Sequence, residues 1–261
     1  MAEINKPISI YPDKIKEQIL KEAAEAGLLP KESKDDNDIK NSLRKNEQEK
    51  DEKYIESAKK RLEELEKIVG FGDHWMICDG PNRGYEYTHD NHLYSIALSS
   101  LGDIQEAKQV LENTLYHIPF GRHGMIGYKR EGEHEFTYNN LLYSIALSSL
   151  GDTQKAKEVL ENTLKNVPLG PHGMIGVEPG DKKEYTKKNL LYSITLSNTG
   201  DIQEAKQVIE NTLKHVLFGP HGMIGDEPGD KKEYTRDSLL LVIAEALIGK
   251  AGETVKIANP F

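Results

Sequence analysis

The stretch Leu93-Tyr-Ser-Ile-Ala-Leu-Ser-Ser-Leu-Gly-Asp103 decides the fold of this chain, because it returns almost unchanged at a fixed distance. It recurs as Leu142-Tyr-Ser-Ile-Ala-Leu-Ser-Ser-Leu-Gly-Asp152 and as Leu191-Tyr-Ser-Ile-Thr-Leu-Ser-Asn-Thr-Gly-Asp201, each copy 49 residues after the one before. A more divergent fourth copy covers Leu240 to Gly249. Self-similarity at a fixed period indicates tandem duplication of one supersecondary unit.

Each copy predicts a pair of helices joined by a tight turn. In the first copy the apolar residues from Leu93 to Leu101 recur with the spacing of one helix face. Gly102 then suits the left-handed residue that commonly ends a helix. A second apolar face runs from Ile104 to Ile118. The pattern therefore predicts an all-α chain of tandem αα-hairpins, which form a curved solenoid or a partial α/α toroid.

Capping residues mark the expected start of each helix. Thr88 stands where the N-cap of the first helix is expected. Asp103 is the expected N-cap of the second helix, and Glu106 three residues later completes a capping-box variant. The second copy carries Lys155 at the position of that glutamate, so its box is half lost.

A loop of about fifteen residues joins one predicted hairpin to the next. Its marker His123-Gly-Met-Ile-Gly127 recurs at His172 and His221, and the first copy reads His74-Trp-Met-Ile. Met174, Ile175 and Tyr185 are expected to anchor the third copy of the loop. Long loops inside a compact domain are usually functional or disordered, and the anchors and the constant length favour function here.

The expected domain organisation follows from the phase of the repeat. Residues 1–30 are expected to form an N-terminal helix or cap, and 31–52 a polar linker or a loosely held helix. The repeat domain spans 53–249 and begins with a second helix over Lys53 to Val69. The tail, 250–261, is the other candidate cap for an open repeat end.

Composition excludes several classes of function. The chain has 261 residues with 34 Lys+Arg against 43 Asp+Glu, a net charge of −9, which argues against nucleic acid and anionic membranes as partners. It lacks a membrane-spanning run and the apolar core of a secretory signal, and Cys78 is its single cysteine. We expect a soluble, cytoplasmic protein without a cofactor.

The hairpin core resembles two kinds of helical hairpin. Leu98-Ser-Ser-Leu-Gly-Asp103 and the alanine four residues later resemble the tetratricopeptide repeat, whose period of 34 residues differs from 49. Tyr87-Thr-His-Asp-Asn91 is similar to the start of inner helices in six-hairpin (α/α) toroid proteins, which include glycoside hydrolases and sugar epimerases. The toroid resemblance implies an active site at the face that carries the long loops.

The loop histidines are candidate ligand-binding residues: His74, His123, His172 and His221. Zinc needs its ligands within about 2.0–2.3 Å of one point. Equivalent residues of hairpins stacked side by side lie roughly 10 Å apart, so four of them cannot share a metal in an open stack. We therefore predict no metal site. The alternative to ligand binding is that each ring holds the backbone of its own loop.

An acid–aromatic–threonine element precedes each first helix, as Glu86-Tyr-Thr, Glu135-Phe-Thr, Glu184-Tyr-Thr and Glu233-Tyr-Thr. A glutamate at this place is expected to complement the helix dipole. The alternative is a carboxylate aimed into a cleft beside an aromatic ring, as in sugar-binding sites.

The first loop, 71–92, differs from the near-identical later copies. Catalysis needs distinct groups in distinct roles, which a divergent copy can supply. The candidate catalytic residues are Asp79, Glu86 and Asp90, and the candidate ligand-binding residues are Trp75, Arg83 and Tyr85. The alternative is that a terminal repeat is atypical because it meets the cap.

Two functions follow from these observations. The near-identity of the later copies favours a binding or scaffold protein whose loop-bearing rim recognises a ligand or a protein partner. The alternative is a carbohydrate-active enzyme of the toroid class, either a glycoside hydrolase or a sugar epimerase, with its site in loop 71–92. Expected partners are a protein or an extended or carbohydrate ligand, and self-association is a third possibility.

Overall fold

The computed structural model describes residues 36–78, 85–128, 134–218, 223–230, 232 and 234–258. The chain divides into two compact units, Met1–Glu64 and Leu65–Phe261. The boundary between them falls inside helix α2 (Asp36–Val69). All the predicted hairpins lie in the second unit.

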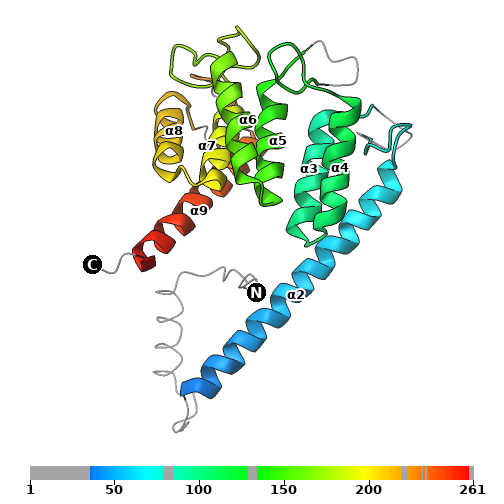
Figure 1. Ribbon diagram of the computed structural model, residues 1–261. Coiled ribbons are helices and arrows are strands. Elements are labelled where there is room, and N and C mark those ends of the chain that lie inside the picture. The colour runs from blue at the N-terminus through cyan, green and yellow to red at the C-terminus, as the bar shows by residue number, and fades with distance from the viewer. Residues whose placement is uncertain are drawn as a thin grey trace. The chain divides into compact units, whose positions relative to one another are not determined.

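The described part of the second unit is helical, and its helices are paired as expected. Three hairpins are formed by α3 (Thr88–Ser100) with α4 (Ile104–His117), α5 (Thr137–Ser149) with α6 (Thr153–Asn166), and α7 (Thr186–Thr199) with α8 (Ile202–His215), and α9 (Thr235–Ala258) follows. The first helices α3, α5, α7 and α9 contact one another in succession (Figure 1). The all-α class and the hairpin pairing are therefore confirmed.

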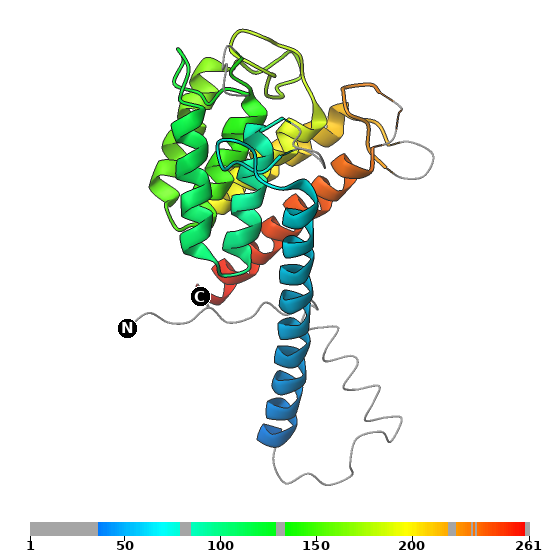
Figure 2. The same cartoon turned by 90° about the vertical axis from the view of Figure 1, so that its right-hand side faces the viewer.

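The long loops gather at one end of the hairpins. They lie at the top of the second unit in both views, whereas the short turns within the hairpins lie at the opposite end (Figures 1 and 2). We call the end with the long loops the loop rim. Any residue in the first turn of α3, α5 or α7 therefore lies at this rim.

A buried serine joins the two helices of each hairpin. The Ser144 hydroxyl donates to the carbonyl of Ala156, 2.7 Å away, across the α5–α6 contact. Ser95 and Ser193 make the same bond to Ala107 and Ala205. These serines and alanines are all fully buried. The small side chains let the two backbones approach, which explains why Ser and Ala recur in the repeated stretch.

The turn inside each hairpin has the predicted geometry. Gly102, Gly151 and Gly200 have φ values of +89°, +87° and +93°, a region that glycine enters without steric cost. The backbone N–H of Asp103 donates to the carbonyl of Leu98 at 2.9 Å, so the last turn of α3 is closed as in a Schellman motif.

The core includes residues from the loops as well as the helices. Met125, Ile126, Met174 and Ile175, from the His-Gly-Met-Ile markers, are completely buried. Met174 and Ile175 therefore act as anchors, as predicted. Cys78 is also buried.

The helix caps differ in part from the prediction. The N-cap of α3 is Tyr87, and Thr88 is its first helical residue, so the predicted threonine cap is wrong. The Thr88 hydroxyl instead donates to the carbonyls of Gly127 (2.8 Å) and Tyr128 (2.9 Å) in the following loop. A bond across the hairpins thus takes the place of a local cap.

The caps of the second helices lie at the predicted positions. Asp103, Asp152 and Asp201 are the N-cap residues of α4, α6 and α8. Asp152, whose copy lost the glutamate of the capping box, accepts a hydrogen bond from the backbone N–H of Lys155 at 3.2 Å. The glutamate of the third copy, Glu204, accepts instead from the Tyr192 hydroxyl at 2.7 Å.

The ends of the chain extend the helical content. One helix, α2, covers 36–69 and contains the predicted helix over Lys53 to Val69, together with most of the segment expected as linker or helix. Helix α9 continues past Gly249 to Ala258. The N-terminal helix or cap expected within residues 1–30 lies outside the described residues. Among the residues that the structure describes, no helix combines the length and the apolar character that crossing a membrane requires.

Candidate functional site at the loop rim

One glutamate holds the loop in each of three repeats. Glu135 Oε1 accepts hydrogen bonds from the backbone N–H groups of His123 (3.0 Å) and Met125 (3.1 Å), while Oε2 lies 2.5 Å from His123 Nδ1. The same arrangement pairs His74 with Glu86 and His172 with Glu184. The loop histidine and the acid–aromatic–threonine element, which the sequence presents as two features, therefore form one unit.

The partners of these groups differ from the expected ones. The imidazole Nδ1 pairs with a glutamate twelve residues on, whereas the alternative to ligand binding is that the ring holds the backbone of its own loop. The glutamate accepts loop amides and contacts the imidazole; we had expected it to complement the helix dipole. Glu135 and Glu184 are only 5% exposed, so each carboxylate is part of the interior of the loop.

This carboxylate requires a glycine two residues before the loop histidine. A Cβ atom on Gly121 would lie 2.7 Å from the carboxyl carbon of Glu135, and one on Gly170 would lie 2.5 Å from that of Glu184. Carbon atoms pack at about 3.5–4.0 Å, so a side chain at either position would displace the glutamate. Glycine is therefore required at these positions, because the glutamate side chain lies where a Cβ atom would be.

An asparagine in the first helix fixes the next part of the loop. Asn140 Oδ1 accepts from the backbone N–H of Ile126 (3.0 Å), and its Nδ2 donates to the carbonyl of Phe136 (3.0 Å). Asn91 and Asn189 repeat this pattern. Ser238 replaces the asparagine in the fourth copy and its hydroxyl accepts from Ile224 N–H at 3.1 Å.

Each loop is also tied to the following hairpin. Asn162, in α6, donates from Nδ2 to the carbonyls of His123 (3.0 Å) and Gly124 (2.9 Å). The backbone N–H of Thr137 donates to the carbonyl of Val177 in the next loop at 2.9 Å. Hydrogen bonds therefore join successive loops along the described part of the rim.

The rim residues between these hydrogen-bonded groups differ in side-chain type from one repeat to the next. Around the first two loops the rings of Tyr87, His89, Tyr128, Phe136 and Tyr138 form an aromatic cluster. The Tyr87 and Tyr128 ring centroids are 4.8 Å apart, and those of Tyr128 and Phe136 are 5.3 Å apart. This end of the rim is aromatic and half-buried.

The third repeat is basic where the first two are aromatic. Lys183, Lys187 and Lys188 place their Nζ atoms 4.9, 5.7 and 4.0 Å from the centroid of the Tyr185 ring. Lys188 is 5% exposed. Burial, together with the charge of Lys187, lowers the pKa of Lys188 to about 8, although Asp226 and Asp181 act in the opposite direction.

The sequence analysis singles out Asp90 but misses Lys188, which occupies the same position of the repeat. Lys188 belongs to a column that reads Asp90, Asn139, Lys188 and Asp237 at steps of 49. The next residue in three of the copies is the loop-binding asparagine. The signal that could have identified Lys188 is a repeat position whose charge changes from copy to copy, next to a position that stays asparagine in three copies.

Trp75 is unusual in both conformation and exposure. Among the described residues it is the one non-glycine residue with positive φ, at 58°. The equivalent residues are Gly124 (φ 68°) and Gly173 (φ 72°). Its side chain is 79% exposed. A bulky residue in a strained conformation that buries little is a marker of function.

We predict that Trp75→Gly is about 1 kcal/mol more stable than Trp75→Ala, because alanine keeps the Cβ atom that makes the left-handed region costly. Urea denaturation followed by far-ultraviolet circular dichroism measures both variants. Equal stabilities would contradict strain at this position.

The structure brings together only some of the residues that the sequence singled out. Asp79, Arg83 and His221 lie outside the described residues. Glu86 contacts His74, and Asp90 Oδ1 lies 3.5 Å from His89 Nε2, so these two carboxylates have different neighbours. Tyr85, like Trp75, is strongly exposed, at 70%.

Neither a metal site nor a comparison with known proteins assigns a function to the rim. Within the described ranges, no three His, Cys, Asp or Glu side chains gather in a way that could hold a metal ion. A scan against protein-family models finds no match to this chain, and a search of curated proteins finds none either. The geometry of the rim is therefore the basis for a functional proposal.

Proposed function

We propose that the chain is a helical-repeat binding protein whose loop rim recognises a protein partner. One observation carries the proposal: the hydrogen bonds that hold the loops are the same in three repeats, whereas the side chains between the bonded residues differ. The Glu–His pair and the asparagine recur in three repeats, whereas the residues between them change from aromatic to basic. Recognition scaffolds combine rigidity with variation in this way.

The exposed aromatic side chains support a protein partner. Trp75 and Tyr85 are 79% and 70% exposed on the first loop. Tryptophan and tyrosine are enriched in the residues that dominate the binding energy of protein interfaces. The proposal further includes a curved solenoid or partial toroid of 49-residue hairpins, since such stacks present an extended surface.

The single tryptophan makes the proposal directly testable. Peptides selected from a random display library on the whole protein are titrated while the fluorescence of Trp75 is followed. We expect a spectral shift on binding and at least a tenfold loss of affinity for Trp75→Phe combined with Tyr85→Ser, measured by calorimetry. The matched control is Tyr54→Ser, because Tyr54 is 68% exposed on α2 and lies outside the rim.

Two outcomes would overturn the proposal. Selected peptides could bind the rim variant and the wild-type protein equally well. Alternatively, a glycan array could yield ligands whose binding depends on Trp75 and Tyr85, while peptide selection yields none. That result would favour the alternative function, a carbohydrate-active enzyme.

A further inference from the structure

A second histidine lies beside the loop histidine in two of the repeats. The ring centroids of His172 and His215 are 4.8 Å apart with an interplanar angle of 51°, and those of His74 and His117 are 4.7 Å apart at 60°. His117 and His215 are the last residues of α4 and α8. Each pair therefore combines a ring of the loop with a ring from the second helix of the hairpin that follows, 43 residues later.

The second repeat carries an asparagine in place of the second histidine. Asn166 stands 43 residues after His123, and its Nδ2 donates to the carbonyls of His123 (3.1 Å) and Asn162 (2.8 Å). In all three repeats another asparagine, one turn earlier, already donates to the carbonyl of the loop histidine: Asn113, Asn162 and Asn211. The loop is therefore held without the second histidine, and its presence in two repeats indicates another use.

The buried glutamate orients the ring of the loop histidine. Glu184 Oε2 lies 2.6 Å from His172 Nδ1, and because an ionised carboxylate can only accept, this nitrogen carries the proton and donates. The neutral ring therefore keeps its lone pair at Nε2. Histidines that bind metal ions in proteins almost always donate their other ring N–H to a carboxylate, a carbonyl or water. The His172 side chain is 42% exposed, so ions in solution can reach it.

The separation of the two rings fits the coordination of one ion. A zinc–nitrogen bond measures about 2.0–2.1 Å, and the centroid of an imidazole lies about 1.1 Å beyond the ligating nitrogen. Two imidazoles that bind one ion at about 90–110° therefore have centroids about 4.4–5.2 Å apart. The observed separations of 4.7 and 4.8 Å lie in this range, and the rings are tilted toward each other rather than stacked in parallel.

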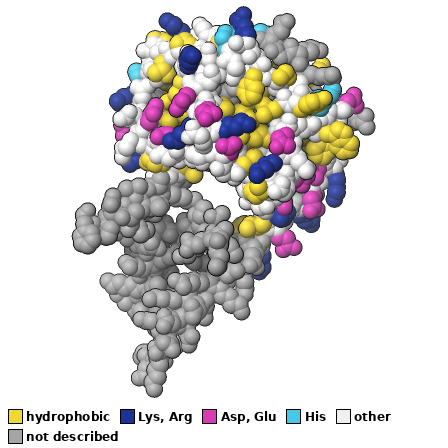
Figure 3. Space-filling model, viewed as in Figure 1, with side chains coloured by type: hydrophobic (Ala, Val, Ile, Leu, Met, Phe, Trp, Pro, Cys, Tyr) yellow, Lys and Arg dark blue, Asp and Glu magenta, His cyan; other side chains and the backbone are white. Residues whose placement is uncertain are grey.

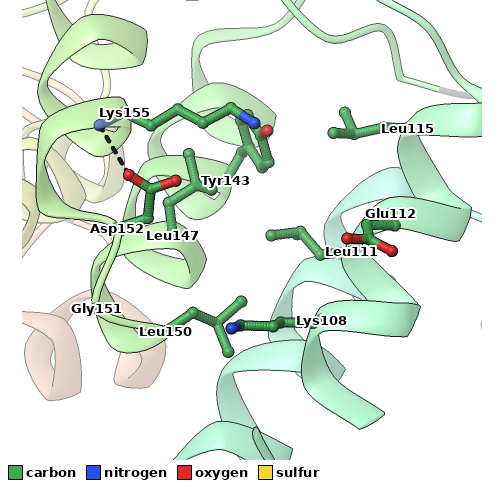
Figure 4. A pocket seen from close by; sticks show the side chains of 10 residues that line it. All are labelled: Lys108, Leu111, Glu112, Leu115, Tyr143, Leu147, Leu150, Gly151, Asp152 and Lys155. Carbon is green, nitrogen blue, oxygen red and sulfur yellow. Dashed lines mark hydrogen bonds between the residues drawn. The ribbon is translucent and has the colours of Figure 1, made fainter. Parts of the chain in front are cut away.

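Histidine side chains reach the surface at the loop rim and not in the cavity between the helices. The space-filling view shows histidines at the surface of the end that carries the long loops (Figure 3). A cavity of about 440 Å³ lies between α4 and the α5–α6 turn (Figure 4). Its lining includes Lys108, Lys155, Glu112 and Asp152 but no histidine or cysteine. The cavity therefore lacks the nitrogen and sulfur ligands that the rim offers.

We propose that each of the two histidine pairs, His74 with His117 and His172 with His215, binds one divalent transition-metal ion at the loop rim. Imidazole nitrogen suits Zn²⁺, Cu²⁺ and Ni²⁺, whereas Mg²⁺ and Ca²⁺ prefer oxygen ligands. Water completes the coordination, since within the described ranges no third His, Cys, Asp or Glu side chain joins either pair. Equivalent histidines of different repeats cannot share an ion, whereas each pair draws both rings from one loop and its own hairpin. The proposal replaces the prediction of no metal site, which considered the loop histidines alone.

The binding test titrates Ni²⁺ into the whole protein, free of any histidine tag, by isothermal titration calorimetry at pH 8, where an ordinary imidazole is neutral. We expect two Ni²⁺ ions per chain and no binding of Mg²⁺. His117→Asn and His215→Asn, which recreate the second repeat, should each remove one ion, and the double variant should remove both. Asn166→His should add a third ion, because His123 and Glu135 already provide the oriented ring.

The controls separate binding at the pairs from unspecific binding and from misfolding. His215→Asn should leave the thermal unfolding midpoint in metal-free buffer within about 2 °C of wild type, because the same loop accommodates asparagine in the second repeat. Glu112→Gln removes an exposed carboxylate far from the pairs in sequence and should leave the number of bound ions unchanged. The proposal is overturned if the wild-type protein binds no Ni²⁺, if Mg²⁺ binds equally well, if the double variant still binds two ions, or if Asn166→His adds none.

Discussion

Replacing Glu135 with alanine is expected to lower the free energy of unfolding by about 4 kcal/mol, the largest loss from any single side chain of the rim. The substitution leaves the backbone N–H groups of His123 and Met125 and the His123 imidazole without their shared acceptor. Leaving a buried donor without an acceptor costs about 1–3 kcal/mol, and two backbone N–H groups and the imidazole lose their shared partner here. Chemical denaturation followed by circular dichroism measures the change.

The control for this prediction is Glu161→Ala on the exposed surface of α6. Surface substitutions of this kind change stability by no more than about 0.5 kcal/mol. Glu135→Gln should fall between the two, because its amide oxygen can still accept from the backbone while the side chain loses its charge. A loss below about 1 kcal/mol for Glu135→Ala would mean that the carboxylate does not hold the loop.

Replacing Lys188 with methionine is expected to raise the free energy of unfolding by about 3 kcal/mol at pH 7. In the folded protein burial lowers the pKa of Lys188 to about 8, whereas an unfolded lysine has a pKa of about 10.4. Between these values the unfolded chain binds more protons than the folded one, so the wild-type protein gains stability as the pH rises. The variant lacks this gain, and its advantage should shrink to about 1.5 kcal/mol at pH 9.5.

The pH dependence separates this charge effect from simple packing. Denaturation curves at pH 7, 8 and 9.5 are compared for wild type and Lys188→Met, and the titration of the tyrosines, which both proteins share, cancels in the difference at each pH. Lys165→Met, at an exposed site, should differ from wild type by no more than about 0.5 kcal/mol at each pH. If the free energies of unfolding of wild type and Lys188→Met differ by the same amount at all three pH values, the charge of the buried ammonium group does not destabilise the protein.

Such a cost fits a role for Lys188 in binding. A charged group that is 5% exposed and packed 4.0 Å from the Tyr185 centroid destabilises the free protein. An anionic group on the partner would relieve the same cost, because a nearby opposite charge stabilises the ammonium. For the proposed protein partner, we therefore expect an acidic residue opposite the basic part of the rim.

Most of the fold could be predicted because it depends on short-range patterns. The hairpins follow from apolar residues spaced at helical intervals, and the turn follows from Gly102 and its counterparts. The anchors Met174 and Ile175 are apolar residues of a loop of constant length, and burial is the favourable place for them. The position of the Asp103 N-cap was also correct.

The candidate site could be predicted only in part. The sequence identifies the loop histidines and the glutamates as recurring groups, but it does not pair His123 with Glu135 across twelve residues. The threonine cap was wrong because Thr88 is the first helical residue and its hydroxyl donates to two carbonyls of the next loop, which wins the competition with a local cap. The outcome of such competition depends on how one repeat packs on the next.

The sequence alone determined the unit of this protein: a helical hairpin, a glycine turn and a long anchored loop, repeated every 49 residues. These features are set by residues a few positions apart, whose preferences act within one copy. The tertiary structure alone decided which polar groups meet between copies, such as the Thr88 hydroxyl and the carbonyl of Gly127, and that Lys188 is buried. The physical reason is register: hydrogen bonds and buried charges depend on ångström-scale placement of side chains from neighbouring hairpins.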